Sequence, residues 1–280
     1  MSDSETAYAK LNLALHIRRR RDDGYHHLET LFAFCENGDV MRVSSSKEFS
    51  MTMDGPFAQG LDGGDDNLVM RAASLLREES GTSRGAALHL EKHLPVASGI
   101  GGGSADAAAT LRLLNRHWQL DWTLDRLAEL ALPLGADVPA CVFSRTMRGE
   151  GVGEKLERID APELAEIAVL LANPRLPLST ATVFGGWDGV DRGGLGHGDI
   201  LAAARAGRND LTPTALSAAP EIAEVIDFLT SRPGSDLVRM SGSGATCYAL
   251  FANSEAAVAA SEHVRARRPQ WWSMLSKLRG

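Results

Sequence analysis

The sequence predicts an α+β protein built from two domains, and three observations support this. The 280 residues exceed the usual length of a single domain. Residues 86–114 change from an alternating pattern to a glycine run and then to an alanine-rich run, which is typical of a strand, a tight loop and a helix. The second half has the patterns strand, helix, strand, strand, helix and strand, the order of a split ferredoxin-like sandwich. We therefore expect domains at residues 1–156 and 157–280.

Composition narrows the class of protein. The net charge of −7 argues against a general surface for nucleic acid or anionic membrane. No apolar run approaches the roughly 20 residues of a membrane span, and the polar N-terminus does not resemble a secretory signal. We expect a cytoplasmic protein with no nucleic-acid or membrane partner. The three cysteines, Cys35, Cys141 and Cys247, have apolar neighbours and favour reduced core residues, and the eight histidines show no zinc-ligand spacing.

The first strand is predicted over residues 7–17, where apolar residues alternate with polar ones. Lys10 and Asn12 lie on the polar face and project side by side. A lysine in such a place is commonly a solvent-facing residue of an edge strand. The pattern alone therefore leaves its role open.

A turn follows the first strand. Arg18 to Arg21 and the Asp-Asp-Gly after them predict a solvated turn. Tyr25 and His26 then offer a stacking plane and a hydrogen-bonding imidazole, which suit a flat heterocycle. Ordinary packing of the two side chains explains the same residues.

Further elements follow in order. We expect a short strand over 40–43, a loop over 54–66, a helix over 67–79 with Asp66 as its N-cap, a strand over 86–92 and a helix over 121–132. Asp137 precedes Val-Pro, so the residue types predict a helix N-cap there as well. Residues 149–154 mark the end of the first domain.

The glycine-rich stretch at residues 99–103 is interpreted as a phosphate-binding loop. Four of its five residues lack a side chain, so backbone N–H groups can approach an anion closely. The helix after Ser104 directs its unpaired N–H groups and positive dipole end at the loop. A flexible linker or a packing turn is the alternative. The spacing fits neither a Walker A loop nor GxGxxG, so a cation has to come from elsewhere in the chain.

In the second half we expect strands at 167–172, 237–240, 247–252 and 270–275, and helices at 220–230 and 254–267, with an extra short helix at 200–206. Residues 187–199 are rich in glycine and predict a mobile surface loop. Residues 240–246 contain Gly-Ser-Gly between two strands, which a simple hairpin turn explains.

The stretch Pro-x-x-x-Gly-Ile-Gly-Gly-Gly-Ser-Ala at 95–105 resembles the second motif of the GHMP kinases, the family of galactokinase, homoserine kinase and mevalonate kinase. The resemblance implies a ribosomal-protein-S5-like α/β domain followed by a ferredoxin-like domain, with ATP and Mg²⁺ as cofactors. Residues 240–246 resemble the third motif, which folds back towards the phosphates. The ATP-binding residues implied are Pro95, Val96, Ala97, Ser98, Gly99, Ile100, Gly101, Gly102, Gly103, Ser104, Ala105, Gly242, Ser243 and Gly244. Of these, Gly101 to Ser104 are the strongest candidates for direct contacts.

Three further stretches are similar to one branch of that family, the diphosphocytidyl-methylerythritol kinases. They are Ala-Lys-Leu-Asn-Leu at 9–13, Asp-Gly-Tyr-His at 23–26 and Leu-Gly-Ala-Asp-Val-Pro at 134–139. The resemblance implies that Lys10 is the active-site cation and Asp137 the catalytic carboxylate. It also implies that Asn12, Tyr25, His26, Thr180 and Phe184 bind the substrate, with Tyr25 and Phe184 on the two faces of cytosine.

The activity implied is transfer of the ATP γ-phosphoryl group to the 2-hydroxyl of a cytidine diphosphate-linked methylerythritol, in the non-mevalonate isoprenoid route. The partners are then small molecules, and the protein is a monomer or homodimer. No residues match a magnesium ligand set. Two alternatives stay open: a homoserine or mevalonate type of kinase, and a nucleotide-binding regulatory protein without turnover.

Overall fold

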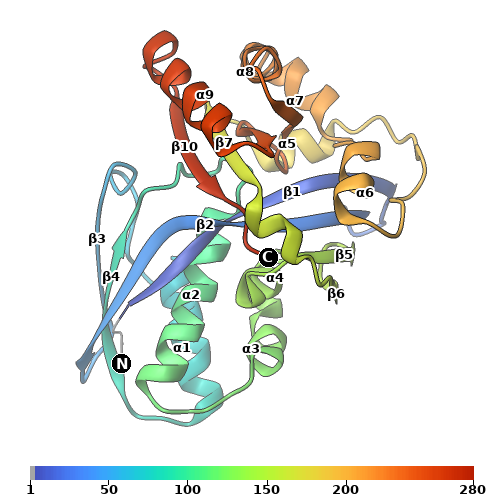
Figure 1. Cartoon of the computed structure of the whole chain (residues 1–280). Coiled ribbons are helices and arrows are strands. Elements are labelled where there is room, and N and C mark those ends of the chain that lie inside the picture. The colour runs from blue at the N-terminus through green and yellow to red at the C-terminus, as the bar shows by residue number, and fades with distance from the viewer. Residues whose placement is uncertain (1–3) are drawn as a thin grey trace. The chain divides into compact units, whose positions relative to one another are not determined.

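The computed structural model describes residues 4–280, which fold into two compact units (Figure 1). Unit 1 takes up the chain as far as Lys10 together with Asn37–Val96 and Gly101–Ser144, and unit 2 takes up Leu11–Glu36, Ala97–Ile100 and Arg145–Gly280. Strands β1 (Ser4–Arg20) and β2 (His26–Ser46) contribute to both units. The division of the sequence at residue 156 stays a prediction.

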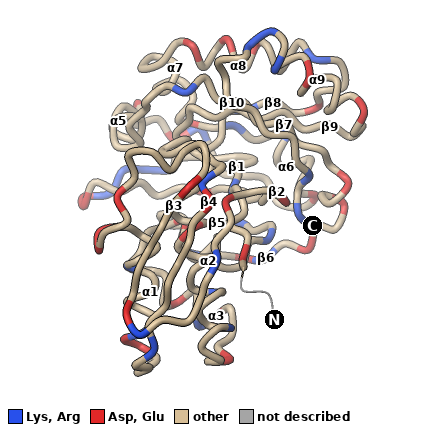
Figure 2. Tube along the Cα trace, turned by 90° about the vertical axis from the view of Figure 1, so that its left-hand side faces the viewer, with Lys and Arg blue, Asp and Glu red and all other residues tan. Residues whose placement is uncertain are grey.

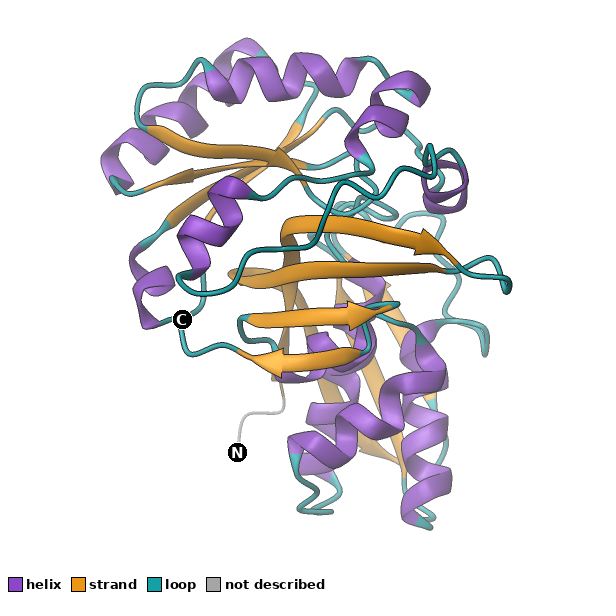
Figure 3. Cartoon of the chain, turned by 90° about the vertical axis from the view of Figure 1, so that its right-hand side faces the viewer, coloured by secondary structure: helices purple, strands orange, loops and turns teal. Residues whose placement is uncertain are grey.

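Unit 1 is a small sheet with helices packed beside it (Figure 3). Strand β4 (Gly85–Glu91) pairs in parallel with β3 (Ser50–Asp54) and antiparallel with residues 40–46 of β2. Helices α1 (Leu68–Ser80) and α2 (Gly102–His117) pack against each other. The short helices α3 (Leu124–Ala131), η1 (Leu132–Leu134) and α4 (Val138–Phe143) complete the unit. The residues that α1 and α3 bury are all apolar.

The predicted elements of unit 1 are present, with corrected ends. Helix α1 and strand β4 match their predictions closely, whereas the strand expected over 40–43 is one part of the long β2. Asp66 was wrong as the N-cap of α1. Asn67 holds that position, and its side chain accepts a hydrogen bond from the N–H of Val69. Asn67 directly precedes the first helical residue, so its side chain reaches the unpaired N–H groups of the first turn. Thr123 caps α3 in the same way.

Unit 2 contains the predicted ferredoxin-like sandwich. Its antiparallel sheet has the order β10-β7-β9-β8, and helices α8 and α9 pack on it. The elements, in chain order, are β7 (Ala168–Asn173), α8 (Glu221–Thr230), β8 (Ser235–Met240), β9 (Cys247–Phe251), α9 (Ser254–Arg267) and β10 (Trp272–Lys277). The predicted α6 (Ile200–Ala206) is present, and two helices that the sequence did not predict, α5 (Thr180–Gly185) and α7 (Thr212–Ala218), join it.

The first half of β2 belongs to unit 2. Residues 28–32 pair antiparallel with β5 (Met147–Gly151), which pairs in turn with β6 (Lys155–Arg158). The prediction of a turn at Arg18 to Arg21 was wrong for most of its length, because β1 continues to Arg20. The short 3-10 helix η2 (Pro162–Glu166) follows β6 and leads into β7.

The glycine-rich loop at 187–199 lies on unit 2 and is fastened by charged groups. The carboxylate of Glu29 accepts hydrogen bonds from the N–H of Leu195 at 2.8 Å and from Arg148 at 2.9 Å. Arg148 also donates to the carbonyl of Gly196 at 3.0 Å, and Arg18 pairs with Asp191 at 3.0 Å. Composition predicted a mobile loop, but these contacts give it fixed attachment points on β1, β2 and β5.

Charges of both signs are interspersed along the chain in both units (Figure 2). Within residues 4–280, no helix has both the length and the apolar composition that a membrane crossing requires. The three cysteines are buried and free, as predicted.

Candidate active site

The glycine loop runs directly into α2, as the sequence predicted. Gly99 and Gly101 have φ values of 76° and 66°, a left-handed conformation that glycine adopts without strain. Gly101 is the N-cap of α2, and the first intrahelical bond joins the N–H of Ala105 to its carbonyl at 2.8 Å. The N–H groups of the residues between them therefore have no partner inside the helix. They form an anion-binding end of a 16-residue helix.

The other residues of the loop have different surroundings. Ile100 is completely buried and anchors the loop, and Ser98 is buried too. Val96 is half exposed, and Ala97 has a φ of 50°, an unusual value for a residue with a side chain. Pro95 ends the chain segment that leaves β4.

Lys10 and Asp137 form an ion pair in unit 1. Lys10 Nζ lies 3.0 Å from Asp137 Oδ2, and the lysine side chain is 3% exposed while the carboxylate is 38% exposed. A side chain at Gly101 would meet this lysine, because an added Cβ would lie 3.0 Å from Lys10 Cε. The loop backbone therefore packs directly on the ion pair. Its burial excludes the alternative that Lys10 is a solvent-facing residue of an edge strand.

Asp137 lies at the start of helix α4. The predicted N-cap position is confirmed, but the capping hydrogen bond is not present. Asp137 holds the N-cap position of α4, with proline in the first turn, but its side chain makes no capping hydrogen bond. The carboxylate turns to Lys10 instead. At the other end of α4, Arg112 of α2 donates to the carbonyls of Cys141 at 2.6 Å and Val142 at 3.2 Å. This buried guanidinium ties the position of the short helix to α2.

A second group of charges lies beside the same loop, and sequence reasoning missed it. Lys92 Nζ donates to a carboxylate oxygen of Asp39 and, at 2.7 Å, to Oδ2 of Asp106. All three side chains are buried, with at most 5% exposed. The one available signal was Asp106, a charged residue among the alanines that begin α2.

Burial dominates the protonation of this group. Burial raises the pKa of Asp106 to about 7, the ammonium of Lys92 opposes the rise, and the charge of Asp39 adds to it. The pKa of Lys92 is raised by its two carboxylates although burial acts against this. The nearby Cys141 thiol has its pKa raised to about 12 by burial, so it is neutral at pH 7.

Within unit 2, residues 240–246 form the predicted hairpin turn, and its backbone folds onto the first part of the glycine loop. Ser241 Oγ donates to the carbonyl of Gly99 at 2.9 Å, and the N–H of Thr246 donates to the carbonyl of Ser98 at 3.2 Å. An added Cβ on Gly99 would lie 2.3 Å from the carbonyl oxygen of Ser241. Gly242 and Gly244 both have positive φ. The two motifs thus meet at backbone distance.

Two further predicted residues lie near that turn. Thr180 Oγ1 is 2.9 Å from Ser243 Oγ. The backbone N–H of Asn12 donates to Ser241 Oγ at 3.2 Å, and its side-chain amide donates to Thr30 Oγ1 at 2.7 Å. Asn12 is buried, so its side chain is held in one orientation.

An aromatic group surrounds His26 in unit 2. The rings of His26 and Phe184 are 5.4 Å apart between centroids, and the indole of Trp187 lies 5.7 Å from His26 in an edge-on arrangement. The ring of Tyr25 is 62% exposed. The structure therefore brings His26 and Phe184 together, adds Trp187, which the sequence analysis did not predict as a site residue, and leaves Tyr25 open to a ligand.

The surroundings of His26 favour its neutral form. Burial lowers its pKa, and the charge of Arg20 lowers it further. Arg20 Nε donates to His26 Nε2 at 3.2 Å, so Nε2 is the accepting nitrogen and the proton of the neutral ring is on Nδ1. Arg20 also donates to the carbonyl of Gly185 at 2.8 Å, next to Phe184.

A magnesium ligand set is not evident. Among residues 4–280 there is no group of three or more His, Cys, Asp or Glu side chains able to hold a metal ion. Mg²⁺ bound with a nucleotide takes most of its ligands from phosphates and water, so such a group is not required.

Comparison with known families gives two matches along the chain. The sequence model described as GHMP kinases N terminal domain matches residues 67–145, and the model described as GHMP kinases C terminal matches residues 193–270. The first match contains the glycine loop, α2 and Asp137, and the second contains the hairpin at 240–246.

Full-length relatives are also found. A 4-diphosphocytidyl-2-C-methyl-D-erythritol kinase of Rhizorhabdus wittichii is 53% identical and covers 100% of this chain and 96% of its own length. One from Agrobacterium fabrum is 45% identical over 96% of this chain and 93% of its own length.

Solved structures give the same picture of the fold. A crystal structure of 4-(cytidine 5'-diphospho)-2C-methyl-D-erythritol kinase superimposes with a TM-score of 0.81 at 33% identity, covering 99% of both chains. Homoserine kinase from Cytophaga hutchinsonii superimposes with a TM-score of 0.71 over 99% of this chain and 95% of its own, but at 17% identity it shares the fold alone.

Proposed function

The chain belongs to the 4-diphosphocytidyl-2-C-methyl-D-erythritol kinases of the GHMP kinase family, and from this premise we propose that it transfers the γ-phosphoryl group of ATP to the 2-hydroxyl of 4-diphosphocytidyl-2-C-methyl-D-erythritol. The products are the 2-phosphate and ADP, in the non-mevalonate isoprenoid pathway. The observation that carries the proposal is the Lys10–Asp137 ion pair packed beneath the helix end at Gly101.

Asp137 is the residue that accepts the proton of the attacking hydroxyl in this proposal. Its carboxylate is the partly exposed member of the pair and makes no capping bond, so one side is open to a substrate. Lys10 holds the carboxylate in place and supplies positive charge beside the transferring group. Because phosphoryl transfer depends mainly on position and charge neutralisation, a fixed carboxylate next to a buried ammonium suits the step.

The loop and the start of α2 bind the phosphates of ATP. The N–H groups of Gly102, Gly103 and Ser104 face an anion with the positive end of the helix dipole behind them. The hydrogen bond from Ser241 Oγ to the carbonyl of Gly99 joins the third motif to this loop. Mg²⁺ accompanies ATP and would neutralise phosphate charge when bound.

The aromatic group in unit 2 recognises the cytosine ring. Tyr25 and Phe184 stack on its faces, and His26 Nδ1–H donates to an acceptor on the base edge, since Arg20 occupies Nε2. Asn12 and Thr180 contact other parts of the substrate. Stacking of one base on an aromatic ring contributes about 1 to 3 kcal/mol.

The cellular setting completes the proposal. Three buried, free cysteines are typical of a reducing compartment, and we place the enzyme in the cytoplasm as a monomer or homodimer that acts on small molecules. Sedimentation of the purified protein decides between the two oligomeric states.

The experiment that tests the function is ADP release from purified protein with MgATP, offering 4-diphosphocytidyl-2-C-methyl-D-erythritol, homoserine and mevalonate in parallel. Turnover only with the first compound is expected. Turnover with homoserine or mevalonate would support a kinase but contradict the proposed cytidine site. ATP binding without turnover on any acceptor would favour a regulatory protein.

The base site has its own test. Tyr25→Leu is expected to raise the KM for the cytidine substrate by about 5-fold to 150-fold, which corresponds to the loss of one stacking contact. The KM for ATP should change little in the same variant. Equal changes in both values would contradict the assignment of Tyr25 to the base.

A further inference from the structure

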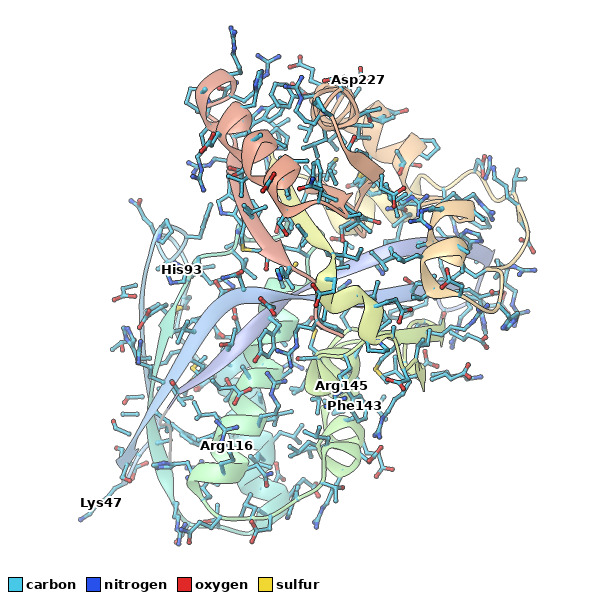
Figure 4. The ribbon with its side chains drawn as sticks, in the orientation of Figure 1. Lys47, His93, Arg116, Phe143, Arg145 and Asp227 are labelled. Atoms are coloured by element: carbon cyan, nitrogen blue, oxygen red, sulfur yellow. The ribbon has the colours of Figure 1, made fainter. Side chains whose placement is uncertain are left out.

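The buried group of Lys92, Asp39 and Asp106 lies in unit 1, where the chain leaves β4 and where α2 begins. Lys92 follows the last residue of β4 and is buried, whereas the side chain of the next residue, His93, is 49% exposed. Figure 4 labels His93 beside the end of β4. One ammonium thus faces inwards and binds two carboxylates from different parts of the chain, one on β2 and one on α2.

The group holds both ends of the glycine loop. On the incoming side, Asp39 Oδ1 accepts hydrogen bonds from the backbone N–H groups of His93 at 2.5 Å and Leu94 at 2.8 Å. On the outgoing side, Asp106 belongs to the second turn of α2. Between the two, Lys92 lies directly against the loop, since an added Cβ on Gly102 would lie 3.2 Å from Lys92 Nζ.

The hydrogen bonding of Asp106 is incomplete. Its Oδ2 binds Lys92, but its Oδ1 is buried and has no hydrogen-bond partner. A buried carboxylate oxygen without a partner is costly, and two carboxylates compete for one ammonium. Such an arrangement is maintained where its geometry serves a purpose beyond stability.

We propose that Asp106, bound through Lys92 to Asp39, is a positioning residue that fixes the glycine loop and the first turns of α2 for the phosphates of ATP. The inference rests on the proposed function and deepens its ATP site. Asp106 acts through Lys92 and the backbone, because it is itself buried.

The positioning role can be tested through the protonation of Asp106, because its charge affects the binding of phosphates. With Asp106 ionised the group carries a net charge of −1, which repels phosphates at the start of α2, and protonation removes this charge. The titratable groups that face Asp106 are Asp39 on β2 and Lys92 after β4, while α4 brings the neutral Cys141 and α1 and α3 bury only apolar residues. With a pKa of about 7, Asp106 is partly ionised at neutral pH and should take up a proton when the nucleotide binds.

The test is calorimetry of MgADP binding at pH 7.5 in two buffers of different ionisation enthalpy, with no acceptor present. Wild-type protein is expected to take up a fraction of a proton per nucleotide, and Asp106→Asn is expected to lose that fraction. In turnover assays, the KM for ATP of the wild type should rise severalfold between pH 6 and pH 8, relative to that of Asp106→Asn.

Thr110→Val is the matched control. Thr110 is buried one turn further along α2, and its hydroxyl donates to the backbone carbonyl of Asp106 at 2.8 Å. This variant should lose stability yet keep wild-type proton uptake and the wild-type pH profile. Wild-type proton uptake in Asp106→Asn would overturn the proposal. Because the binding readout needs no acceptor, it is independent of whether phosphoryl transfer occurs.

Discussion

Two groups of lysine and aspartate side chains pack against adjacent glycines of the same loop. The open group is Lys10 with Asp137, the buried group is Lys92 with Asp39 and Asp106, and they differ mainly in their access to solvent. Lys10 packs against Gly101 and pairs with the carboxylate of Asp137, whose side chain is 38% exposed. Lys92 packs against Gly102 and binds two carboxylates that are almost completely buried. An open carboxylate can exchange its partner for a substrate, whereas a buried carboxylate cannot be reached by one. On the roles proposed above, the same residue types serve chemistry on one side of the loop and positioning on the other.

The largest effect is expected from a change in the open group of Lys10 and Asp137. On its proposed role, Asp137→Asn should lower kcat by about 10²-fold to 10⁴-fold, because a positioned base is lost while the side-chain shape is kept. Steady-state assays of ADP release measure this, and nucleotide binding should stay within about twofold of wild type. A variant with near wild-type kcat would remove Asp137 from the catalytic step.

The second largest effect is expected from a change in the buried group of Lys92, Asp39 and Asp106. Lys92→Met leaves two buried carboxylates without their cation and should lower the free energy of unfolding by about 3 to 5 kcal/mol. Urea unfolding followed by circular dichroism measures the loss. Lys10→Met is the matched variant on the open side and should lose less, since Asp137 can be hydrated. Equal losses would contradict the difference between the two groups.

A smaller effect appears as a function of pH. Because the pKa of Asp106 is raised to about 7, the folded state binds its proton more tightly than the unfolded state does. This stabilisation is complete below about pH 4 and is lost as the pH rises through 7. Between pH 5 and pH 8 the wild type should therefore lose about 1 to 3 kcal/mol relative to Asp106→Asn. Parallel changes in the Tm of both proteins would show that Asp106 does not titrate in this range.

The smallest effect concerns the loop between the groups. Gly101→Ala places a side chain at a φ of 66° and 3.0 Å from Lys10, so it should cost about 1 to 2 kcal/mol of stability and raise the KM for ATP. Gly103→Ala is the control, because its Cβ would meet only Leu68 at 3.6 Å within a helix. The free energy of unfolding of that variant should be unchanged or slightly increased. A neutral Gly101→Ala would contradict the close packing on Lys10.

These two groups also show how far the sequence can predict a site. The proximity of Lys10 and Asp137 was predictable, because each lies in a short motif that resembles a known family. The partners Asp39, Lys92 and Asp106 are far apart in the sequence and share no motif, so only the fold brings them together. The order of elements in unit 2 was predictable from periodicity, whereas the attachments of the 187–199 loop depend on distant charges such as Glu29 and Arg148.

The division of the chain between the two units has a consequence for synthesis on the ribosome. All residues of unit 1 are available once Ser144 has emerged, because the last segment of this unit ends there. Residues 11–36, made almost at the start, belong to unit 2, whose remaining strands are made last. Strands β1 and β2 pair with each other, and residues 11–36 of this first hairpin must therefore wait for most of the chain before their apolar side chains are covered. Expression of residues 1–156 alone should expose this hairpin and recruit chaperones.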